Sequence, residues 1–255
     1  MFVAVSTNCF PDLNLQEAME RLADLEYSAA EIVVGETHGQ LRPFELAEKF
    51  DSIIRVCRSS RRITPISFLY HVDPVDPNDG KYEEYFEHFT TLCHLAKALK
   101  VISISVLPAK FGTAFNDEIK RLKRLVDLGN REGIHVGLMT LTDTLTEDTE
   151  TVGSFCKMVP GLTVSLDPTH YIYGNPKPKD YDPILSHVSH VRLRDSTKDN
   201  FQVQIGQGDV EYGRLVTQLG LVGYKRALCV DLAVLPNIDP IAELRKMRLL
   251  LECLL

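Results

Sequence analysis

Short apolar runs alternate with longer amphipathic segments along the whole chain. Each run is rich in β-branched and other apolar residues, which is typical of a buried strand. Between the runs, apolar residues recur with the 3.6-residue period of a helix. The pattern therefore predicts strands over Phe2–Ser6, Ala30–Val34, Pro65–Tyr70, Val101–Val106, His135–Met139, Thr163–Leu166, His190–Leu193 and Ala227–Val230.

Several of the amphipathic segments carry recognisable helix start signals. Asn14 precedes an apolar-periodic run, and Glu17 follows three residues later, which is a capping-box pattern. Pro43 suits the first turn of the next helix. The predicted helices span Leu15–Leu22, Phe44–Cys57, Tyr82–Leu99, Phe115–Glu132, Thr149–Met158, Tyr181–His187, Tyr212–Leu221 and Pro240–Leu254.

Eight strand–helix pairs in 255 residues predict a single-domain (β/α)8 TIM barrel over residues 1–255. A doubly wound open sheet is the alternative, but it would carry a glycine-rich turn after the first strand. The corresponding segment, Ser6–Pro11, contains no glycine. Two long polar loops, Asp73–Gly80 and Asn175–Asp182, follow strands. In a barrel they lie on the catalytic face, although plain surface insertions remain an alternative.

Composition narrows the classes of partner. The chain is 44% hydrophobic and 25% charged, with a net charge of −7, as in ordinary globular proteins. The only basic run is Arg58–Arg62, so we expect no nucleic-acid partner. No apolar run is long enough to span a membrane, so no membrane partner is expected. The six cysteines are scattered without a C-x-x-C pair, which favours reduced thiols and a cytoplasmic location.

Candidate chemistry appears where two predicted strands end. Asp167 closes an apolar run, and His170 follows three residues later. A carboxylate and an imidazole together suit a divalent metal or a proton transfer. The segment His190–Ser196 has the same form, an alternating strand with a charged tip. We expect both tips at one mouth of the barrel.

Four motifs follow one another in the second half of the chain. Leu166–His170 matches L-D-x-x-H, and His190–Ser196 matches H-V-H-L-K-D-S except at its basic positions. Ile205–Val210 matches P/I-G-x-G-x-I. Leu219–Tyr224, followed by Cys229–Asp231, matches L-x-x-x-G-Y and V-E. In this order they resemble the xylose-isomerase-like TIM-barrel superfamily, which contains sugar-phosphate isomerases and epimerases, ketose 3-epimerases and endonuclease IV.

The resemblance implies a divalent metal held by a Glu, an Asp, a His and a second Glu on four strand tips. It also implies that the two Glu side chains move protons beside a substrate carbonyl. This chain keeps the Asp as Asp167. Met139 stands at the first Glu position, Arg192 at the His position, and the shorter Asp231 at the last Glu position.

These departures change the expected chemistry. A thioether is a poor ligand for Mg²⁺ or Mn²⁺, and Met139 cannot act as a base. Arg192 brings a fixed positive charge to the metal position, where it is expected to pair with Asp167 and Asp231. We therefore expect no cofactor. If Mn²⁺, Mg²⁺ or Zn²⁺ binds after all, Asp167 and Asp231 are its expected ligands.

Three functions remain open. The first is a sugar phosphate isomerase/epimerase-like protein acting on a small carbohydrate-like substrate through a largely degenerate metal site. The second is a non-catalytic ligand-binding or scaffold barrel. The third is a metal-independent lyase or isomerase that uses the charge of Arg192. A homo-oligomeric contact through the C-terminal leucines, Leu249–Leu251 and Leu254–Leu255, is an alternative to core packing of those residues.

The remaining site residues are assigned from these hypotheses. For turnover, the candidates are Asp231 and His170 for proton transfer and Arg192 for holding an anion or polarising a carbonyl. The substrate-binding candidates are His71, Glu31, Lys110 and Asp195. Each also has a structural alternative: a hydrogen-bonded loop residue for the histidine, a backbone contact for the glutamate, a solvated side chain for the lysine, and a pair with Arg192 or Arg194 for the aspartate.

Overall fold

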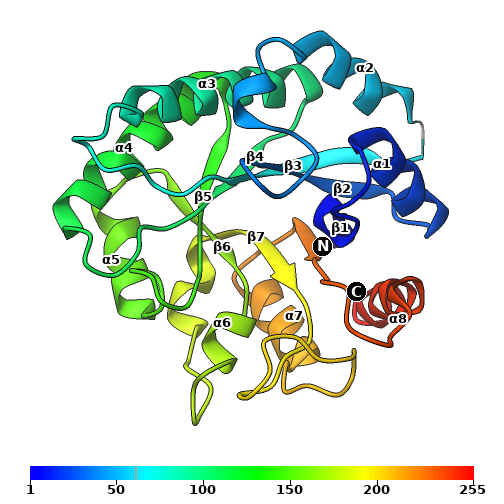
Figure 1. Ribbon diagram of the computed structural model, residues 1–255. Helices are drawn as coiled ribbons and strands as arrows, with labels where there is room; N and C mark the ends of the chain where they lie inside the picture. Colours follow the sequence, from blue (N-terminus) through cyan, green and yellow to red (C-terminus); the bar gives the residue numbers. More distant parts are fainter. Residues whose placement is uncertain (61) are drawn as a thin grey trace.

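The computed structural model describes residues 1–60 and 62–255, so Arg61 of the basic run lies outside the described residues. Eight parallel strands close into a barrel in chain order, and helices surround it (Figure 1). The predicted (β/α)8 barrel is therefore confirmed. The strands are β1 (Phe2–Ser6), β2 (Ala29–Gly35), β3 (Thr64–His71), β4 (Ser103–Val106), β5 (His135–Met139), β6 (Leu162–Leu166), β7 (Val188–Leu193) and β8 (Ala227–Val230).

Most helices start where the sequence predicts. Asn14 forms the expected capping box with Glu17 at the start of α1. Two expectations were wrong. Pro43 opens a 3₁₀ turn that buries Leu46, and the following helix begins only at Phe50. The segment expected as a helix over Tyr181–His187 is a 3₁₀ helix, η3. The helices are α1 (Leu15–Asp24), α2 (Phe50–Ser59), α3 (Tyr82–Leu99), α4 (Phe115–Glu132), α5 (Thr149–Met158), α6 (Thr169–Ile172), η3 (Asp182–His187), α7 (Tyr212–Leu221) and α8 (Pro240–Glu252).

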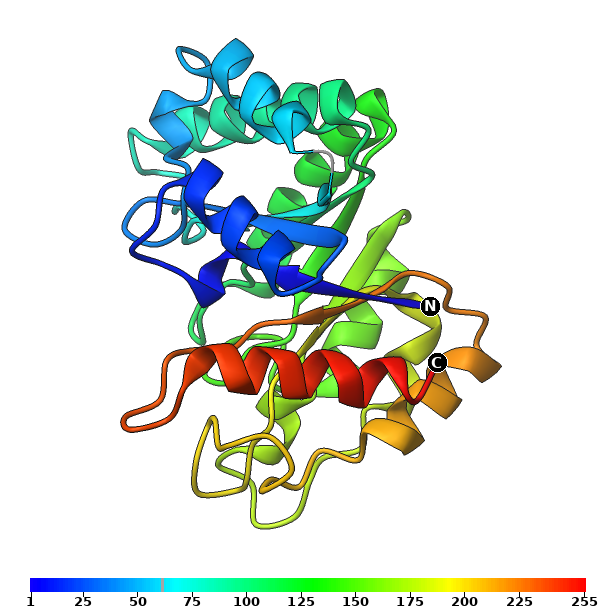
Figure 2. The same ribbon diagram turned by 90° about the vertical axis from the view of Figure 1, so that its right-hand side faces the viewer.

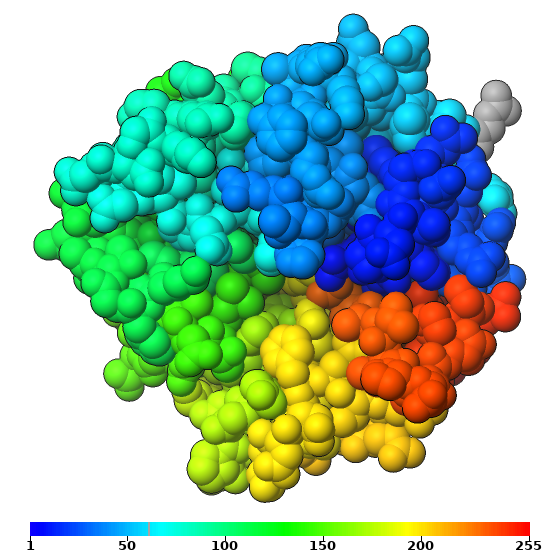
Figure 3. All heavy atoms as spheres, viewed as in Figure 1, coloured from blue at the N-terminus to red at the C-terminus, as the bar shows by residue number. Residues whose placement is uncertain are grey.

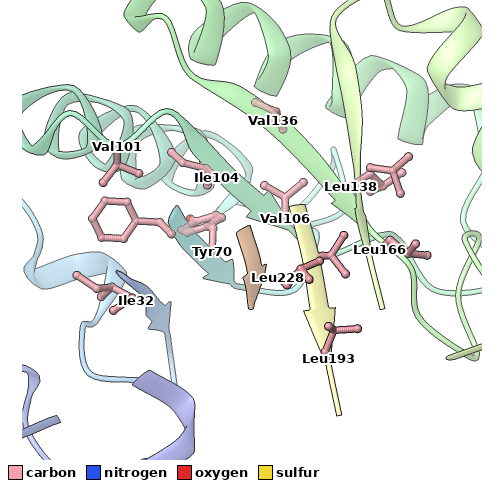
Figure 4. Close-up of a cluster of buried hydrophobic side chains, with 14 of the residues drawn as sticks. Ile32, Tyr70, Val101, Ile104, Val106, Val136, Leu138, Leu166, Leu193 and Leu228 are labelled. Atoms are coloured by element: carbon pink, nitrogen blue, oxygen red, sulfur yellow. The ribbon is translucent and has the colours of Figure 1, made fainter. Parts of the chain in front are cut away.

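The main apolar core lies between the strands and the surrounding helices. Side chains alternate along a strand, so every second residue faces outward. Ile32, Tyr70, Leu166 and Leu228 are outward residues of this kind, and each is fully buried (Figure 4). Burial of a large aliphatic or aromatic side chain stabilises a fold by about 1.5–3 kcal/mol. This layer fixes the strands and therefore the positions of their inward-facing side chains.

The inside of the barrel is much more polar than the outside. Ser105 Oγ and Ser165 Oγ meet across it at 3.0 Å. One end is packed with the small cluster of Ala4, Ala29, Ala227 and Cys229. The opposite end, at the carboxyl ends of the strands, is the mouth that carries the predicted site.

The barrel closes where the two ends of the chain meet. β1 pairs with β8, and the N-terminus lies beside the end of α8 (Figure 2). All six cysteines are free thiols, five of them buried. Within residues 1–60 and 62–255, the structure contains no helix with the length and apolar character needed to cross a membrane.

Candidate functional site

Arg192 joins two carboxylates inside the barrel mouth. It lies on β7, where alternation places residues 190, 192 and 194 on one face. Its Nη1 contacts Oε1 of Glu31 from β2, and its Nη2 donates to Oδ2 of Asp231 at 2.7 Å. The expected pairing of Arg192 with Asp231 is present.

Arg194 supplies the second guanidinium at the mouth. Its Nη2 contacts Oδ2 of Asp231 and lies 3.1 Å from Oδ2 of Asp167. Asn8 Nδ2 donates to the other Asp231 oxygen at 3.2 Å. Asp167 therefore pairs with Arg194 rather than with Arg192, its expected partner. We call these five charged side chains the mouth ion network: Glu31, Asp167, Arg192, Arg194 and Asp231.

The mouth ion network is almost entirely closed to solvent. Glu31 and Asp167 are 0% exposed, and Arg192 and Asp231 are 2% exposed. Burial alone would raise the pKa of Asp231, but Arg192 and then Arg194 outweigh it and hold that pKa well below its usual range. Burial also acts to raise the pKa of Glu31, but Arg192 and His190 outweigh burial and leave that pKa below its usual range. Both carboxylates are therefore charged at neutral pH.

His170 borders the network from the surface side. Its Nδ1 accepts a hydrogen bond from the Thr142 backbone N–H at 3.1 Å, which places the proton of a neutral imidazole on Nε2. That Nε2 lies 3.8 Å from Oδ2 of Asp167. Burial lowers the pKa of His170 against the attraction of Asp167, and Arg194 lowers it further. His170 is thus a neutral donor held against the network.

The other side of the mouth is apolar. Met139, which stands at the first Glu position of the implied ligand pattern, is buried in a cluster with Val33, Leu69 and Leu107. Leu141 packs against this cluster. No carboxylate from β5 reaches the network. We call this cluster the apolar side: Val33, Leu69, Leu107 and Met139. We call the opposing set the ionic side: Asp167, Arg192, Arg194 and Asp231.

The remaining predicted residues divide between the mouth and its rim. Glu31 lies inside the barrel, bound to an arginine rather than to backbone. His71 ends β3 and lies edge-on to His38, with ring centroids 5.9 Å apart. Lys110 is exposed and pairs with Asp73 at 2.9 Å. That pair lines a groove of about 550 Å³ between the loops that follow β3 and β4. Its carboxylate partner makes Lys110 a rim residue, separate from the network.

Asp195 pairs with neither Arg192 nor Arg194, contrary to that alternative. Its Oδ2 accepts the backbone N–H groups of Gly206 at 2.7 Å and Gly208 at 3.0 Å. Gly206 has φ +82°, a conformation that favours glycine. At position 208, a Cβ would lie 2.1 Å from Asp195 Oδ1, so only glycine fits. Asp195 therefore shapes the loop after β7 rather than the ligand side of the mouth.

That loop brings an unpredicted aromatic residue to the mouth. The Phe201 ring lies 5.0 Å from the His170 ring and 4.9 Å from the Arg194 guanidinium carbon. Gln202 ties the loop to β8 through two hydrogen bonds with the Ala233 backbone. In Figure 3 the yellow atoms extend from the lower edge of this face towards its centre, between the green and orange segments. The loop thus covers the ionic side.

Sequence reasoning did not assign Arg194, Asn8 or Phe201 to the site. Arg194 could have been found, because strand alternation places it on the same face as Arg192. Asn8 lies in a three-residue 3₁₀ helix after β1 (Thr7–Cys9) and Phe201 in the loop after β7, and the sequence offers no periodic signal for either.

Comparison with known proteins places these observations in a family. Residues 19–250 match the family described as "Xylose isomerase-like TIM barrel". No curated protein matches the chain. A D-tagatose 3-epimerase-like protein shares the fold with a TM-score of 0.78 and 17% identity, over 100% of this chain and 98% of the other.

Two further solved structures share the fold over 99–100% of this chain. A xylose isomerase domain protein from Alicyclobacillus acidocaldarius has a TM-score of 0.77 at 14% identity, over 98% of its own chain. The probable 3-DHS dehydratase AsbF from Bacillus anthracis also has a TM-score of 0.77, at 15% identity and over 99% of each chain. The same barrel therefore occurs in proteins named for different reactions, so the site must carry any functional argument.

Proposed function

The chain belongs to the xylose isomerase-like TIM barrel family, and we propose that it binds a small polar, carbohydrate-like ligand without a divalent metal at the strand tips of the mouth. Sugar epimerases among its structural neighbours, such as those named for D-tagatose, L-ribulose and D-allulose, support the ligand class. The position of Arg192 carries the metal-free part of the proposal. Its guanidinium bridges Glu31 and Asp231, where the family resemblance implies a metal.

The donor set at the mouth does not fit a metal of the expected kind. Mg²⁺ and Mn²⁺ require several converging oxygen ligands. Asp167 and Asp231 both contact Arg194, and the first Glu position holds the Met139 thioether. A metal would have to displace charge-assisted contacts that already neutralise these carboxylates. The two arginines therefore replace the metal as the positive charge of the mouth.

The same contacts argue against the proton transfers of an epimerase. An efficient general base has a pKa near the working pH. The pKa of Asp231 is held far below its usual range by Arg192 and Arg194 against burial, so its carboxylate is a weak base. Met139 has no titratable group. Ligand binding without turnover is accordingly the function that the geometry supports best.

Metal-independent isomerisation is the second candidate, and His170 is the observation that favours it. Its neutral imidazole lies beside Arg194 and under Phe201 at the edge of the mouth. A neutral histidine can accept or give a proton, while an arginine stabilises a developing oxyanion. His170→Gln separates the candidates, because it removes turnover but retains a hydrogen-bonding side chain for ligand contact.

The test measures metal, ligand and turnover on the same preparation. We expect D-tagatose or D-allulose to bind wild type with and without added Mn²⁺, as seen by saturation-transfer NMR, and no C3-epimer to form. Met139→Glu/Arg192→His restores the implied first Glu and the His, with Asp231 still at the second Glu position, and this variant is expected to gain Mn²⁺ binding. Met139→Leu/Arg192→His is its control, since it lacks only the new carboxylate. Stoichiometric Mn²⁺ in wild type that Asp167→Asn abolishes would overturn the proposal.

A further inference from the structure

Three side chains of different chemistry meet inside the barrel: Glu31 from β2, His190 from β7 and Cys229 from β8. One ligand atom from each lies within 4.8 Å of the other two, and all three residues are buried. We propose that they bind one Zn²⁺ ion in the barrel interior. The site is distinct from the strand-tip set considered above, and it uses neither Asp167 nor position 139.

The orientation of two of these groups is the first support. His190 Nε2 lies 2.9 Å from Glu31 Oε2, yet neither atom has an aligned hydrogen-bond partner. The exposed fractions are 2% for His190 and 0% for Glu31. A buried polar atom without a hydrogen bond is costly. A cation bound between these atoms and the Cys229 sulfur satisfies both.

The donor types and their surroundings match zinc. Zinc binds carboxylate oxygen, imidazole nitrogen and thiolate sulfur at about 2.0–2.3 Å. Arg192 contacts Glu31 through Oε1, which leaves Oε2 as the ligand atom. Ligating carboxylates are commonly held by such outer contacts. Closing the three donors onto one ion requires only small side-chain rotations of groups already within 4.8 Å of each other.

Charge balance is an independent support. The mouth ion network has three carboxylates but only two guanidinium groups, so it carries a buried net charge of −1. Binding of Zn²⁺ with release of the Cys229 thiol proton to solvent adds +1, which neutralises the interior.

The experiment measures zinc content per folded chain. Wild type purified from zinc-supplemented medium is expected to hold one zinc per chain by mass spectrometry of the elements. Cys229→Ser is expected to lower that content at least tenfold. Cys57→Ser is the matched control, because Cys57 is a buried thiol on α2 outside the barrel. Asp167→Asn is expected to retain the zinc, which separates this site from a metal at the mouth.

A spectroscopic readout covers the case in which Cys229→Ser does not fold. Wild type refolded with Co²⁺ is expected to show a thiolate-to-cobalt charge-transfer band, which a carboxylate and imidazole site cannot give. Absence of metal and of the band overturns the proposal and leaves the direct contact between His190 and Glu31 as the arrangement of these side chains. If Asp167→Asn loses the zinc and Cys229→Ser keeps it, the interior site is likewise overturned. That result would place the metal at the strand tips and would also contradict the proposal of a metal-free mouth.

Discussion

The two sides of the barrel mouth are stabilised by different physics. The apolar side packs aliphatic side chains from β2 to β5 and the residues that follow these strands. The ionic side, from β6 to β8, joins each charge to at least one opposite charge. Two of the three departures from the implied ligand pattern fall one on each side: Met139 joins an apolar cluster and Arg192 an ionic one. Each of these two residues therefore matches the character of its neighbours.

The comparison also predicts how each side responds to damage. Contacts in an apolar cluster are many and individually weak, so a truncation costs in proportion to the cavity it leaves. In a buried ionic network, removal of one member leaves charges without partners. The ionic side should therefore be the less tolerant of the two, although it need not be the greater source of stability.

The largest effect is expected from Arg192→Met. The variant keeps a side chain of similar length but leaves Glu31 buried without its guanidinium and weakens the pairing of Asp231. Breaking a buried pair in this way costs about 3–5 kcal/mol. Urea unfolding monitored by circular dichroism measures the loss. Adding Glu31→Gln to the variant should recover part of the lost free energy of unfolding. A loss below about 1 kcal/mol for Arg192→Met alone would contradict the view that the mouth ion network depends on this guanidinium.

A smaller effect is expected from Leu69→Ala on the apolar side. Leu69 is 2% exposed, and a buried Leu→Ala change costs about 2–5 kcal/mol through lost transfer energy and the cavity. The lower half of this range is expected here, because Leu69 belongs to a small cluster at the mouth. Leu69→Met is the matched control, with a cost below about 1.5 kcal/mol because the volume is conserved. If both Leu69 variants destabilise more than Arg192→Met, the contrast between the two sides is wrong.

These differences also mark how far the sequence alone could reach. The period of the apolar residues predicts the barrel, because strand and helix burial repeat with distinct spacings. The Arg192–Asp231 pair was predictable from strand tips that meet at one edge. The choice of Arg194 over Arg192 for Asp167 was not, because it depends on strand stagger and side-chain reach in three dimensions. Phe201 was hidden for a similar reason, since its loop is fixed by Asp195 and two glycines rather than by a period.

Mild acid should separate the two sides with a smaller change. The pKa of Asp231 is lowered in the folded state, where Arg192 and Arg194 outweigh burial. Its contribution is therefore complete above the unfolded pKa of about 3.9 and is lost as the pH falls below about 4. Urea midpoints of wild type should fall between pH 5 and pH 3. Leu69→Ala should fall in parallel, whereas Arg192→Met should fall less steeply because its Asp231 pKa is less depressed; a parallel line for Arg192→Met would count against the network.

The smallest effect is expected at the rim, where an ion pair exists without burial. Lys110 and Asp73 are 73% and 66% exposed in their side chains, and water and salt screen such a pair. Lys110→Ala should leave the urea midpoint of wild type unchanged within error, with or without 1 M salt. Arg121→Met is the buried comparison, since Arg121 and Glu118 are 4% and 1% exposed, and it should lower the midpoint clearly. A clear drop in the urea midpoint for Lys110→Ala would show that the exposed Lys110–Asp73 pair stabilises the fold. Burial would then no longer explain why the buried ion pairs of this barrel are sensitive to substitution and the exposed pair is not.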